Sequence, residues 1–222
     1  ISDFAQFGER WKFACEDIGT LDRLVPDVDA LINCAAETHV DNSLADPRRF
    51  ITTNINGVHH LLELVRGKRN YQIPRFLQVS TDEVYGSVSH GQTLETAVLN
   101  PSSPYAASKA AADHLVQAWG VTYDVPWNII RPSNCYGPHQ YPEKLIPKAI
   151  RCQMLGKLFP VHGLGTQTRS WLNVEDCASA ILTVLDKAPV NEVYNVGGNC
   201  EASVMEILGL LGNPAHTLGY DR

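Results

Sequence analysis

Short apolar runs alternate along this chain with longer segments in which apolar residues recur every three or four positions. The runs at residues 30–34, 75–80 and 127–131 have the length of buried strands, and the segments between them have the period of a helix. Parallel neighbours in a sheet need a crossover connection, which is usually a helix, so this order predicts a parallel sheet with helices on both faces. We therefore expect a doubly wound α/β fold that binds its ligands at the carboxyl ends of the strands.

The two longest helical segments carry residues that favour a helix start. Apolar residues recur at helical steps over residues 46–65, where Asp46 can cap the helix and Pro47 suits its first turn. A second helix is predicted over residues 103–119, beginning with Ser103 and a proline. Each helix would place one apolar stripe against the sheet.

Weaker patterns cover the remainder of the chain. Trp11, Phe13 and Cys15 alternate with polar neighbours, which predicts a further strand. The pattern also predicts helices at 143–155, 174–187 and 203–211 and a strand at 192–196. Three prolines, Pro138, Pro142 and Pro147, mark a change in pattern, and we place a loose boundary after residue 137.

The composition excludes several classes of protein. Hydrophobic residues make up 44% of the chain and charged residues 19%, as in an ordinary globular protein. The net charge of −6 comes without a cluster of Lys and Arg, which argues against nucleic-acid binding. The longest apolar stretches are far shorter than the roughly 20 residues that span a bilayer, and no secretory signal is visible. We expect a small-molecule partner, with no nucleic acid and no membrane.

The six cysteines show no CxxC pair and no spacing typical of a zinc site. They are Cys15, Cys34, Cys135, Cys152, Cys177 and Cys200, and most of them lie within apolar segments. We expect reduced core cysteines in a cytoplasmic protein, and no metal site.

The strongest local motif is Tyr105-Ala-Ala-Ser-Lys109, because residues four apart on a helix project from the same face. A nearby ammonium favours the phenolate, so Lys109 would lower the pKa of Tyr105 and make it a base near neutral pH. The lysine could also hold a ribose. The same spacing occurs on solvated helix faces, so the surroundings of the motif decide its interpretation.

Polar residues follow directly where the predicted strand at 75–80 ends. The segment 80–86 reads Ser-Thr-Asp-Glu-Val-Tyr-Gly and contains two adjacent carboxylates, Asp82 and Glu83. Such a pair can be an exposed turn, but strand ends are also where catalytic groups gather. For both to serve one ligand, the chain must turn after Ser80, because successive residues of a strand face opposite sides.

In this order the motifs resemble the extended short-chain dehydrogenase/reductase family and, within it, the dTDP-glucose 4,6-dehydratases. The resemblance covers nearly the whole chain and rests on residues 17–18, 34–41, 53–54, 80–86, 104–109, 133–138, 142–147 and 167–171. The Thr-Asp-Glu triplet at 81–83 separates dehydratases from the related 4-epimerases and decarboxylases. The resemblance implies a Rossmann-like doubly wound sheet, with a partial dinucleotide-binding domain over 1–137. A mainly substrate-binding region over 138–222 would be interleaved with it.

The activity that this resemblance implies is NAD-dependent dehydration of dTDP-glucose or UDP-glucose, a lyase reaction of deoxysugar biosynthesis. Tyr105 would take the proton of the C4 hydroxyl while hydride leaves C4, with Thr81 bonded to that hydroxyl and Lys109 gripping the ribose. Glu83 would then remove the C5 proton and Asp82 would protonate the departing C6 hydroxyl. Hydride returned to C6 and a proton returned to C5 give a 4-keto-6-deoxy sugar nucleotide, with no net redox change. The two carboxyls need opposite protonation states, and we predict that the raised pKa is that of Asp82.

The resemblance also assigns binding residues. The cofactor side comprises Asp17, Ile18, Cys34, Ala35, Ala36, Thr53, Tyr105, Lys109 and Cys135. The substrate side comprises Thr38, Thr81, Asn134, Lys144, Leu145, Pro160, Val161, His162, Arg169 and Ser203. Arg169 suits a diphosphate because its planar fork makes charge-assisted bonds to phosphate oxygens. The alternative is a surface arginine paired with an acid such as Glu175.

Two features depart from the family pattern. No glycine-rich dinucleotide fingerprint is present, so we expect the chain to begin after the first strand and its loop, through disorder or truncation. Ser203 stands where many relatives have Asn, so the resemblance leaves recognition of the base, thymidine or uridine, undetermined. Cys135 also departs from the common Asn, but a backbone contact could survive that change.

Two other functions stay open at this point. One is a nucleotide-sugar 4-epimerase or decarboxylase that uses Tyr105 and Lys109 without the carboxylate pair, and the other is a catalytically silent nucleotide-binding protein. The family likeness also implies a homodimer, formed by the helices at 46–65 and 104–119.

Overall fold

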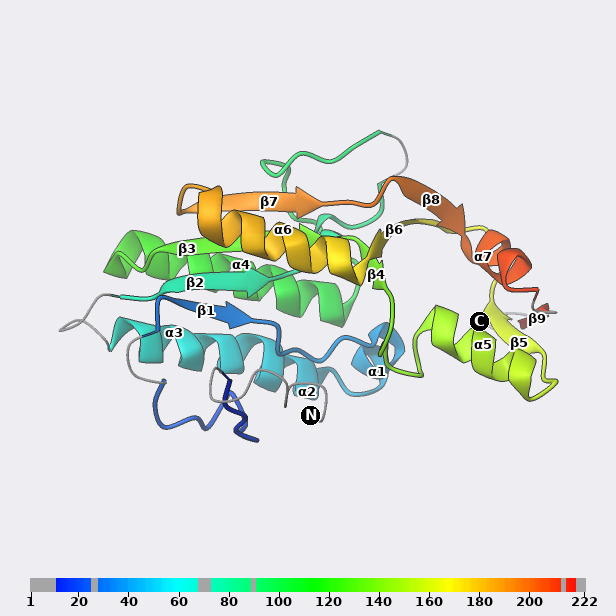
Figure 1. Cartoon of the computed structure of the whole chain (residues 1–222), viewed down its shortest axis with the longest axis horizontal. Coiled ribbons are helices and arrows are strands. Elements are labelled where there is room, and N and C mark those ends of the chain that lie inside the picture. Colours follow the sequence, from blue (N-terminus) through cyan, green and yellow to red (C-terminus); the bar gives the residue numbers. More distant parts are fainter. Residues whose placement is uncertain (1–10, 25–27, 68–72, 89–90, 213–214, 219–222) are drawn as a thin grey trace.

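The computed structural model describes residues 11–24, 28–67, 73–88, 91–212 and 215–218. Its main sheet is parallel, and its strands lie in the order β1 (Ala30–Asn33), β2 (Arg75–Val79), β3 (Trp127–Pro132) and β7 (Glu192–Val196). Helices cover both faces of this sheet (Figure 1). The predicted doubly wound, Rossmann-like sheet is confirmed, and each of these strands lies within one residue of its predicted bounds.

Alternating strand residues build a core on each face of the main sheet. On one face, Phe76 and Ile129 pack with the apolar stripes of α3 (Val58–Arg66) and α4 (Pro104–Tyr123). On the other face, Leu77 and Ile130 pack against α6 (Val174–Lys187). The period of two along each strand therefore explains why helices are needed on both sides.

The helix predicted over 46–65 is broken into several pieces. It comprises α2 (Pro47–Phe50), a π-helical segment η2 (Ile51–Gly57) and α3, and it is preceded by an unpredicted short helix, α1 (Val40–Ala45). Asp46 stands before α2 as expected, but its side chain makes no capping bond. The wide turn of η2 holds the buried Asn54, whose Nδ2 donates to the Ser108 hydroxyl of α4 at 2.9 Å. This bond ties the segment after β1 to the helix that carries Tyr105.

The strand predicted around Trp11, Phe13 and Cys15 is wrong. Residues 11–17 have no regular secondary structure, and the Phe13 side chain is 60% exposed. A strand needs a hydrogen-bonded neighbour, and β1 is the edge of the main sheet within the described residues.

A smaller lobe follows β3. It holds the sheet of β4 (Asn134–Tyr136), β6 (Thr168–Asn173) and β8 (Cys200–Ser203), and the pair β5 (Phe159–His162) and β9 (Ala215–Leu218). Helices α5 (Leu145–Met154) and α7 (Val204–Leu210) pack against β5 around Ala149, Phe159, Val161 and Leu208. The helices predicted at 143–155 and 203–211 are confirmed with slightly shorter bounds, and the helix at 174–187 has its predicted bounds.

The cysteines are less buried than expected. Cys15, Cys34 and Cys200 are exposed, and Cys177 alone among the six is buried. Cys34 is exposed because it follows β1 at the open carboxyl edge of the sheet, and Cys15 because it lies in the irregular segment. None of the described helices is long and apolar enough to cross a lipid bilayer.

Candidate active site

The chain turns where β2 ends, as the paired carboxylates require. Thr81 is still extended, with φ −158° and ψ 151°, and the next residues form a 3-10 turn, η3 (Asp82–Tyr85). The Thr81 hydroxyl starts this turn by accepting a bond from the Glu83 amide at 3.3 Å. The turn keeps Asp82 and Glu83 half-buried on the same side of the sheet edge, so the interpretation as a solvated turn is wrong.

Helix α4 brings the other half of the site to the same place. Ser103 caps the helix by accepting a bond from the Ala106 amide at 3.1 Å, as predicted. Tyr105 is 7% exposed and Lys109 is 3% exposed, which excludes a solvated helix face. The Thr81 hydroxyl and the charges of both carboxylates all affect the pKa of Tyr105, so these side chains lie close together. The proposed catalytic groups therefore converge on one site.

Burial dominates the electrostatics of the two carboxyls. It raises the pKa of Asp82, while the Thr81 hydroxyl and the Arg169 charge act in the opposite direction. Burial also raises the pKa of Glu83, and the neighbouring Asp82 charge raises it further. The predicted rise in the pKa of Asp82 is confirmed, and burial raises the pKa of Glu83 in the same direction.

The expectation that Lys109 lowers the pKa of Tyr105 is wrong for this structure. Burial and the negative charges of Glu83 and Asp82 raise the pKa of Tyr105, and the Thr81 hydrogen bond only partly opposes them. The Lys109 ammonium instead donates to the Val79 carbonyl at 2.7 Å. Its own burial lowers the pKa of Lys109 to about 8, although the Asp113 charge raises it.

The expected cofactor residues line the carboxyl edge of the main sheet. Cys34 and Ala35 follow β1 and are exposed, and Ala36 is half-buried beside them. Thr53 is half-buried in η2, and the exposed Asp17 accepts a bond from the Gly19 amide at 2.7 Å. Further members of this set take part in packing: Ile18 contacts the core cluster beneath α3, and Cys135 shares a hydrogen bond with Cys177 that raises the pKa of Cys135.

Two of the expected substrate residues contact each other across the two lobes. The Lys144 ammonium donates to the Thr38 carbonyl at 3.2 Å and to its hydroxyl at 3.1 Å. Lys144 also lies near enough to Glu83 for each charge to affect the pKa of the other group. This bridge joins the start of α5 to the segment after β1.

Arg169 is the second cation beside the carboxyls. It is exposed on β6, and its charge lowers the pKa of both Asp82 and Glu83. Its guanidinium donates to the Thr168 carbonyl at 3.0 Å, and none of the ion pairs among the described residues joins it to Glu175. An exposed guanidinium facing the carboxyl cluster suits an anionic ligand better than a structural role.

The remaining expected substrate residues lie on the elements around this cleft. Asn134 begins β4, Leu145 begins α5 and packs on its core, and Pro160 is half-buried in β5. The Val161 side chain is 1% exposed within the lobe core, so a ligand could reach only its backbone. Ser203 caps α7 in a capping box with Glu206. The His162 backbone ends β5, and its side chain lies outside the described residues.

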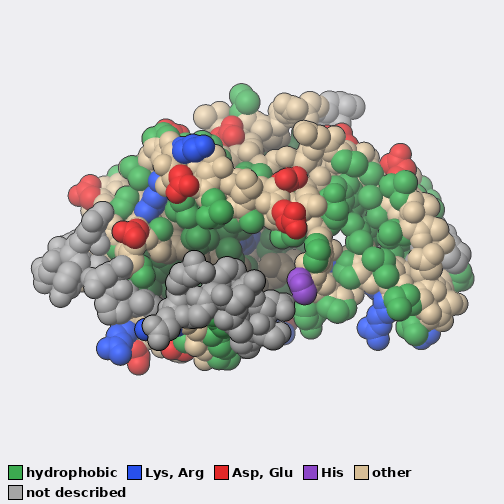
Figure 2. All heavy atoms as spheres, in the orientation of Figure 1, with side chains coloured by type: hydrophobic (Ala, Val, Ile, Leu, Met, Phe, Trp, Pro, Cys, Tyr) green, Lys and Arg blue, Asp and Glu red, His purple; other side chains and the backbone are tan. Residues whose placement is uncertain are grey.

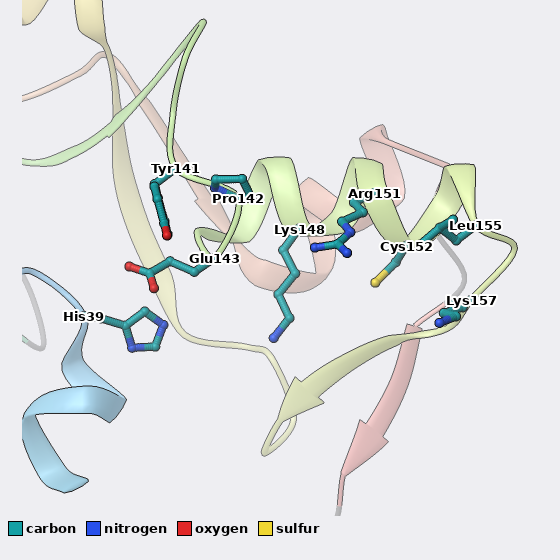
Figure 3. Close-up of a pocket in the computed structure, with 9 residues that line it drawn as sticks. All are labelled: His39, Tyr141, Pro142, Glu143, Lys148, Arg151, Cys152, Leu155 and Lys157. Atoms are coloured by element: carbon teal, nitrogen blue, oxygen red, sulfur yellow. The ribbon is translucent and has the colours of Figure 1, made fainter.

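A cavity of about 630 Å³ opens beside the Thr38–Lys144 bridge. His39 and Glu143, the sequence neighbours of that bridge, line one end, and Lys148 and Arg151 project into it from α5 (Figure 3). The surface is hollowed between the two lobes on this side of the molecule (Figure 2). Sequence reasoning missed the basic lining, although the spacing of Lys148 and Arg151 on one helix face is a signal for it.

Comparisons with known proteins agree with this geometry. The profile of the NAD dependent epimerase/dehydratase family matches residues 10–197. The dTDP-glucose 4,6-dehydratase of Xanthomonas campestris is 49% identical over 187 residues, which cover 81% of this chain and 53% of that protein. The enzyme of the same name from Neisseria meningitidis is 41% identical over 223 residues, covering 94% of this chain and 63% of that protein.

Solved structures give the same picture. The dTDP-glucose 4,6-dehydratase DesIV of Streptomyces venezuelae, solved with NAD bound, has a TM-score of 0.82 at 38% identity, covering 86% of this chain and 61% of its own. The UDP-glucuronic acid 4-epimerase of Bacillus cereus, also solved with NAD, has a TM-score of 0.88 at 29% identity, covering 97% and 70%. The chain thus spans 53% to 63% of the length of the two curated dehydratases named above.

Proposed function

Since the chain belongs to the NAD dependent epimerase/dehydratase family, we propose that it carries the catalytic centre of a nucleotide-sugar 4,6-dehydratase. This lyase would convert dTDP-glucose or UDP-glucose to the 4-keto-6-deoxy sugar nucleotide. The observation that carries the proposal is the buried turn that holds Asp82 and Glu83 against Thr81 and Tyr105. Oxidation at C4 needs only the tyrosine and lysine, whereas elimination of water needs an acid and a base as well.

The side chains have complementary roles in this reaction. Tyr105 would take the proton of the C4 hydroxyl, which Thr81 would also bind. Burial and the charges of Glu83 and Asp82 raise the pKa of Tyr105, so this step needs the positive charge of an oxidised nicotinamide nearby to favour the phenolate. The resulting C4 ketone acidifies the C5 proton, which Glu83 removes while Asp82 protonates the C6 hydroxyl that leaves as water. Burial raises the pKa of Asp82, which is the direction that favours its role as the acid.

The residues at the carboxyl edge of the sheet fit NAD, which when bound accepts hydride from C4 and returns it to C6. Lys109 offers a buried ammonium whose bond to Val79 uses one of its three donors, which leaves donors for ribose hydroxyls. Cys34 and Ala35 are exposed, which leaves room for the approach of a flat ligand. Asp17, Ile18, Ala36, Thr53 and Cys135 complete the proposed cofactor side.

Arg169 and Lys144 supply the positive charge for the diphosphate of the substrate, with Thr38, Asn134, Leu145, Pro160, Val161, His162 and Ser203 around it. In this proposal residues 1–137 hold mainly the cofactor, and residues 138–222 mainly the sugar nucleotide. Strand β7 and helix α6 return to the main sheet, which supports an interleaved division. The enzyme would work in the cytoplasm as a homodimer.

A 4-epimerase is the second candidate, favoured by the structural likeness to the B. cereus enzyme. The test is to incubate the full-length protein with dTDP-glucose and UDP-glucose in deuterated water. Dehydration gives a 6-deoxy product with deuterium at C5, and the nucleotide that reacts faster identifies the base. An epimerised sugar that has lost no water would overturn the proposal, as would the absence of any turnover.

A further inference from the structure

A buried chain of polar side chains lies beneath the candidate active site. Arg131 of β3 is 3% exposed, and its Nε donates to the Oδ2 of Asp113 at 3.0 Å. Asp113 belongs to α4, one turn beyond Lys109, and is fully buried. Such pairs contribute little net stability, because both charges lose their hydration. Their position is therefore more informative than their strength.

The same arginine reaches the catalytic turn. Its Nη1 donates to the Tyr85 hydroxyl at 2.7 Å, and its guanidinium lies 4.9 Å from the centroid of the Tyr85 ring. The Tyr85 hydroxyl in turn donates to Oδ1 of Asn195 on β7 at 2.7 Å. Tyr85 is the last residue of η3, the turn that contains Asp82 and Glu83. One hydroxyl thus ties the end of this turn to two strands of the main sheet.

The exit of the turn is fixed as well. Gly86 has φ 78°, a conformation that favours glycine, and its α-carbon lies so close to the Asn100 carbonyl that a side chain would not fit. The Asn100 amide donates to the Val84 carbonyl at 3.0 Å. Both contacts hold the turn against the backbone at Asn100.

We propose that Tyr85 and Arg131 are positioning residues that set the placement of Asp82 and Glu83 relative to Tyr105. The chain Asp113–Arg131–Tyr85 is the only polar link among the described residues that connects α4 to the end of η3 through side chains. Its loss should affect the carboxyl turn and leave the Tyr105–Lys109 pair, which is held by α4 itself. The inference rests on the proposed function, because only a dehydratase uses both groups in separate steps.

The test is Tyr85→Phe in the full-length enzyme. Phenylalanine keeps the ring under the guanidinium and removes only the hydroxyl that bonds Arg131 and Asn195. A small displacement of a catalytic group can slow its step by about a hundredfold, so elimination should slow by about tenfold or more while C4 oxidation continues. Reduced nicotinamide should then accumulate during turnover, kcat should fall more than KM changes, and deuterium should enter C5 more slowly.

Tyr123→Phe is a matched control, because Tyr123 also lies under a guanidinium, that of Arg66 at 4.5 Å, but at the opposite end of α4. It should leave the rates of C4 oxidation and of water elimination unchanged. Arg131→Lys provides a second variant, since it keeps the buried charge and loses the guanidinium that bonds Asp113 and Tyr85 together. A Tyr85→Phe enzyme that melts at a lower temperature but keeps the wild-type balance of the two steps would overturn the inference. So would equal slowing of both steps. A wild-type protein that dehydrates nothing would instead refute the proposed function, and this inference with it.

Discussion

The ammonium of Lys109 donates a 2.7 Å hydrogen bond to the carbonyl of Val79, the last residue of β2. Two residues later Thr81 starts the turn that contains both carboxyls. A side chain expected to serve a ligand therefore also fastens α4 to the strand end that precedes the catalytic turn. The cost of burying its charge is visible in the pKa of Lys109, which is lowered from 10.5 to about 8.

Lys109→Met should abolish activity but raise the free energy of unfolding at pH 7 by about 2 kcal/mol. The lowered pKa corresponds to roughly 3 kcal/mol of destabilisation by the buried charge. Methionine fills similar space and loses one hydrogen bond, worth about 1 kcal/mol. Urea titration of both proteins measures the difference.

The stability that Lys109→Met gains over the wild type should shrink as the pH rises. The unfolded chain keeps the lysine proton up to about pH 10.5, whereas the folded chain releases it near pH 8, so the wild type gains stability between these values and the variant does not. The difference should be complete at pH 7 and small above about pH 10. Lys12→Met, at an exposed residue, should show no such trend. A difference that grows with pH would contradict the burial argument.

Glu83→Gln should stabilise the fold near neutral pH while lowering dehydration by about a hundredfold or more, as expected for loss of a general base. Burial and the Asp82 charge raise the pKa of Glu83, so the folded chain binds this proton more tightly than the unfolded chain. The ionised glutamate therefore lowers stability as the pH rises through its raised pKa, and glutamine removes that loss. Thermal melting and product analysis measure the two effects. Glu175→Gln, at an exposed residue, should change neither.

The main sheet could be predicted because short runs rich in apolar residues, which form the buried central strands β2 and β3, alternate with segments of helical period. The turn after Ser80 could also be inferred, since two adjacent carboxylates can share a ligand only if the strand ends there. The prediction of a strand at 11–15 was wrong because alternation of apolar and polar residues does not by itself supply a neighbouring strand. Helix α1 could not be predicted because it has no apolar stripe. Its cap is the His39 ring, which accepts a bond from the Asn42 amide.

The electrostatics of the site could be predicted only in part. The pKa of Asp82 rises because the turn is buried, which the sequence does not show, whereas the like charge visible in the sequence acts on Glu83. The direction of the Lys109 side chain is set by the Val79 carbonyl, a contact 30 residues away that no local pattern reveals. The pair of Asp113 and Arg131 was missed for the same reason, because its members lie on different elements and share no motif spacing.

Arg169→Gln should raise the KM for the nucleotide sugar by about tenfold, the usual effect of losing a charged hydrogen bond. The Arg169 charge lowers the pKa of both Asp82 and Glu83. Without it both pKa values rise, so the acidic limb of the pH–rate profile should move to higher pH. Arg23→Gln, at an exposed residue away from the carboxyls, is the control. An unchanged KM together with an unchanged acidic limb would show that Arg169 does not bind the substrate.

Ser203→Ala should lower the free energy of unfolding by about 1 kcal/mol, because the Ser203 hydroxyl caps α7. The hydroxyl accepts a bond from the Glu206 amide at 3.2 Å, and the Ser203 amide donates to the Glu206 carboxylate at 2.7 Å. Ser203→Asn keeps a side-chain oxygen for the cap and should retain nearly all of the stability. The two variants therefore separate capping of α7 from recognition of the base.

If Ser203 also contacts the base, Ser203→Asn should alter the ratio of kcat/KM for dTDP-glucose and UDP-glucose while the melting temperature stays constant. If the ratio of kcat/KM for the two nucleotide sugars is unchanged in both variants, Ser203 only caps α7 and does not contact the base.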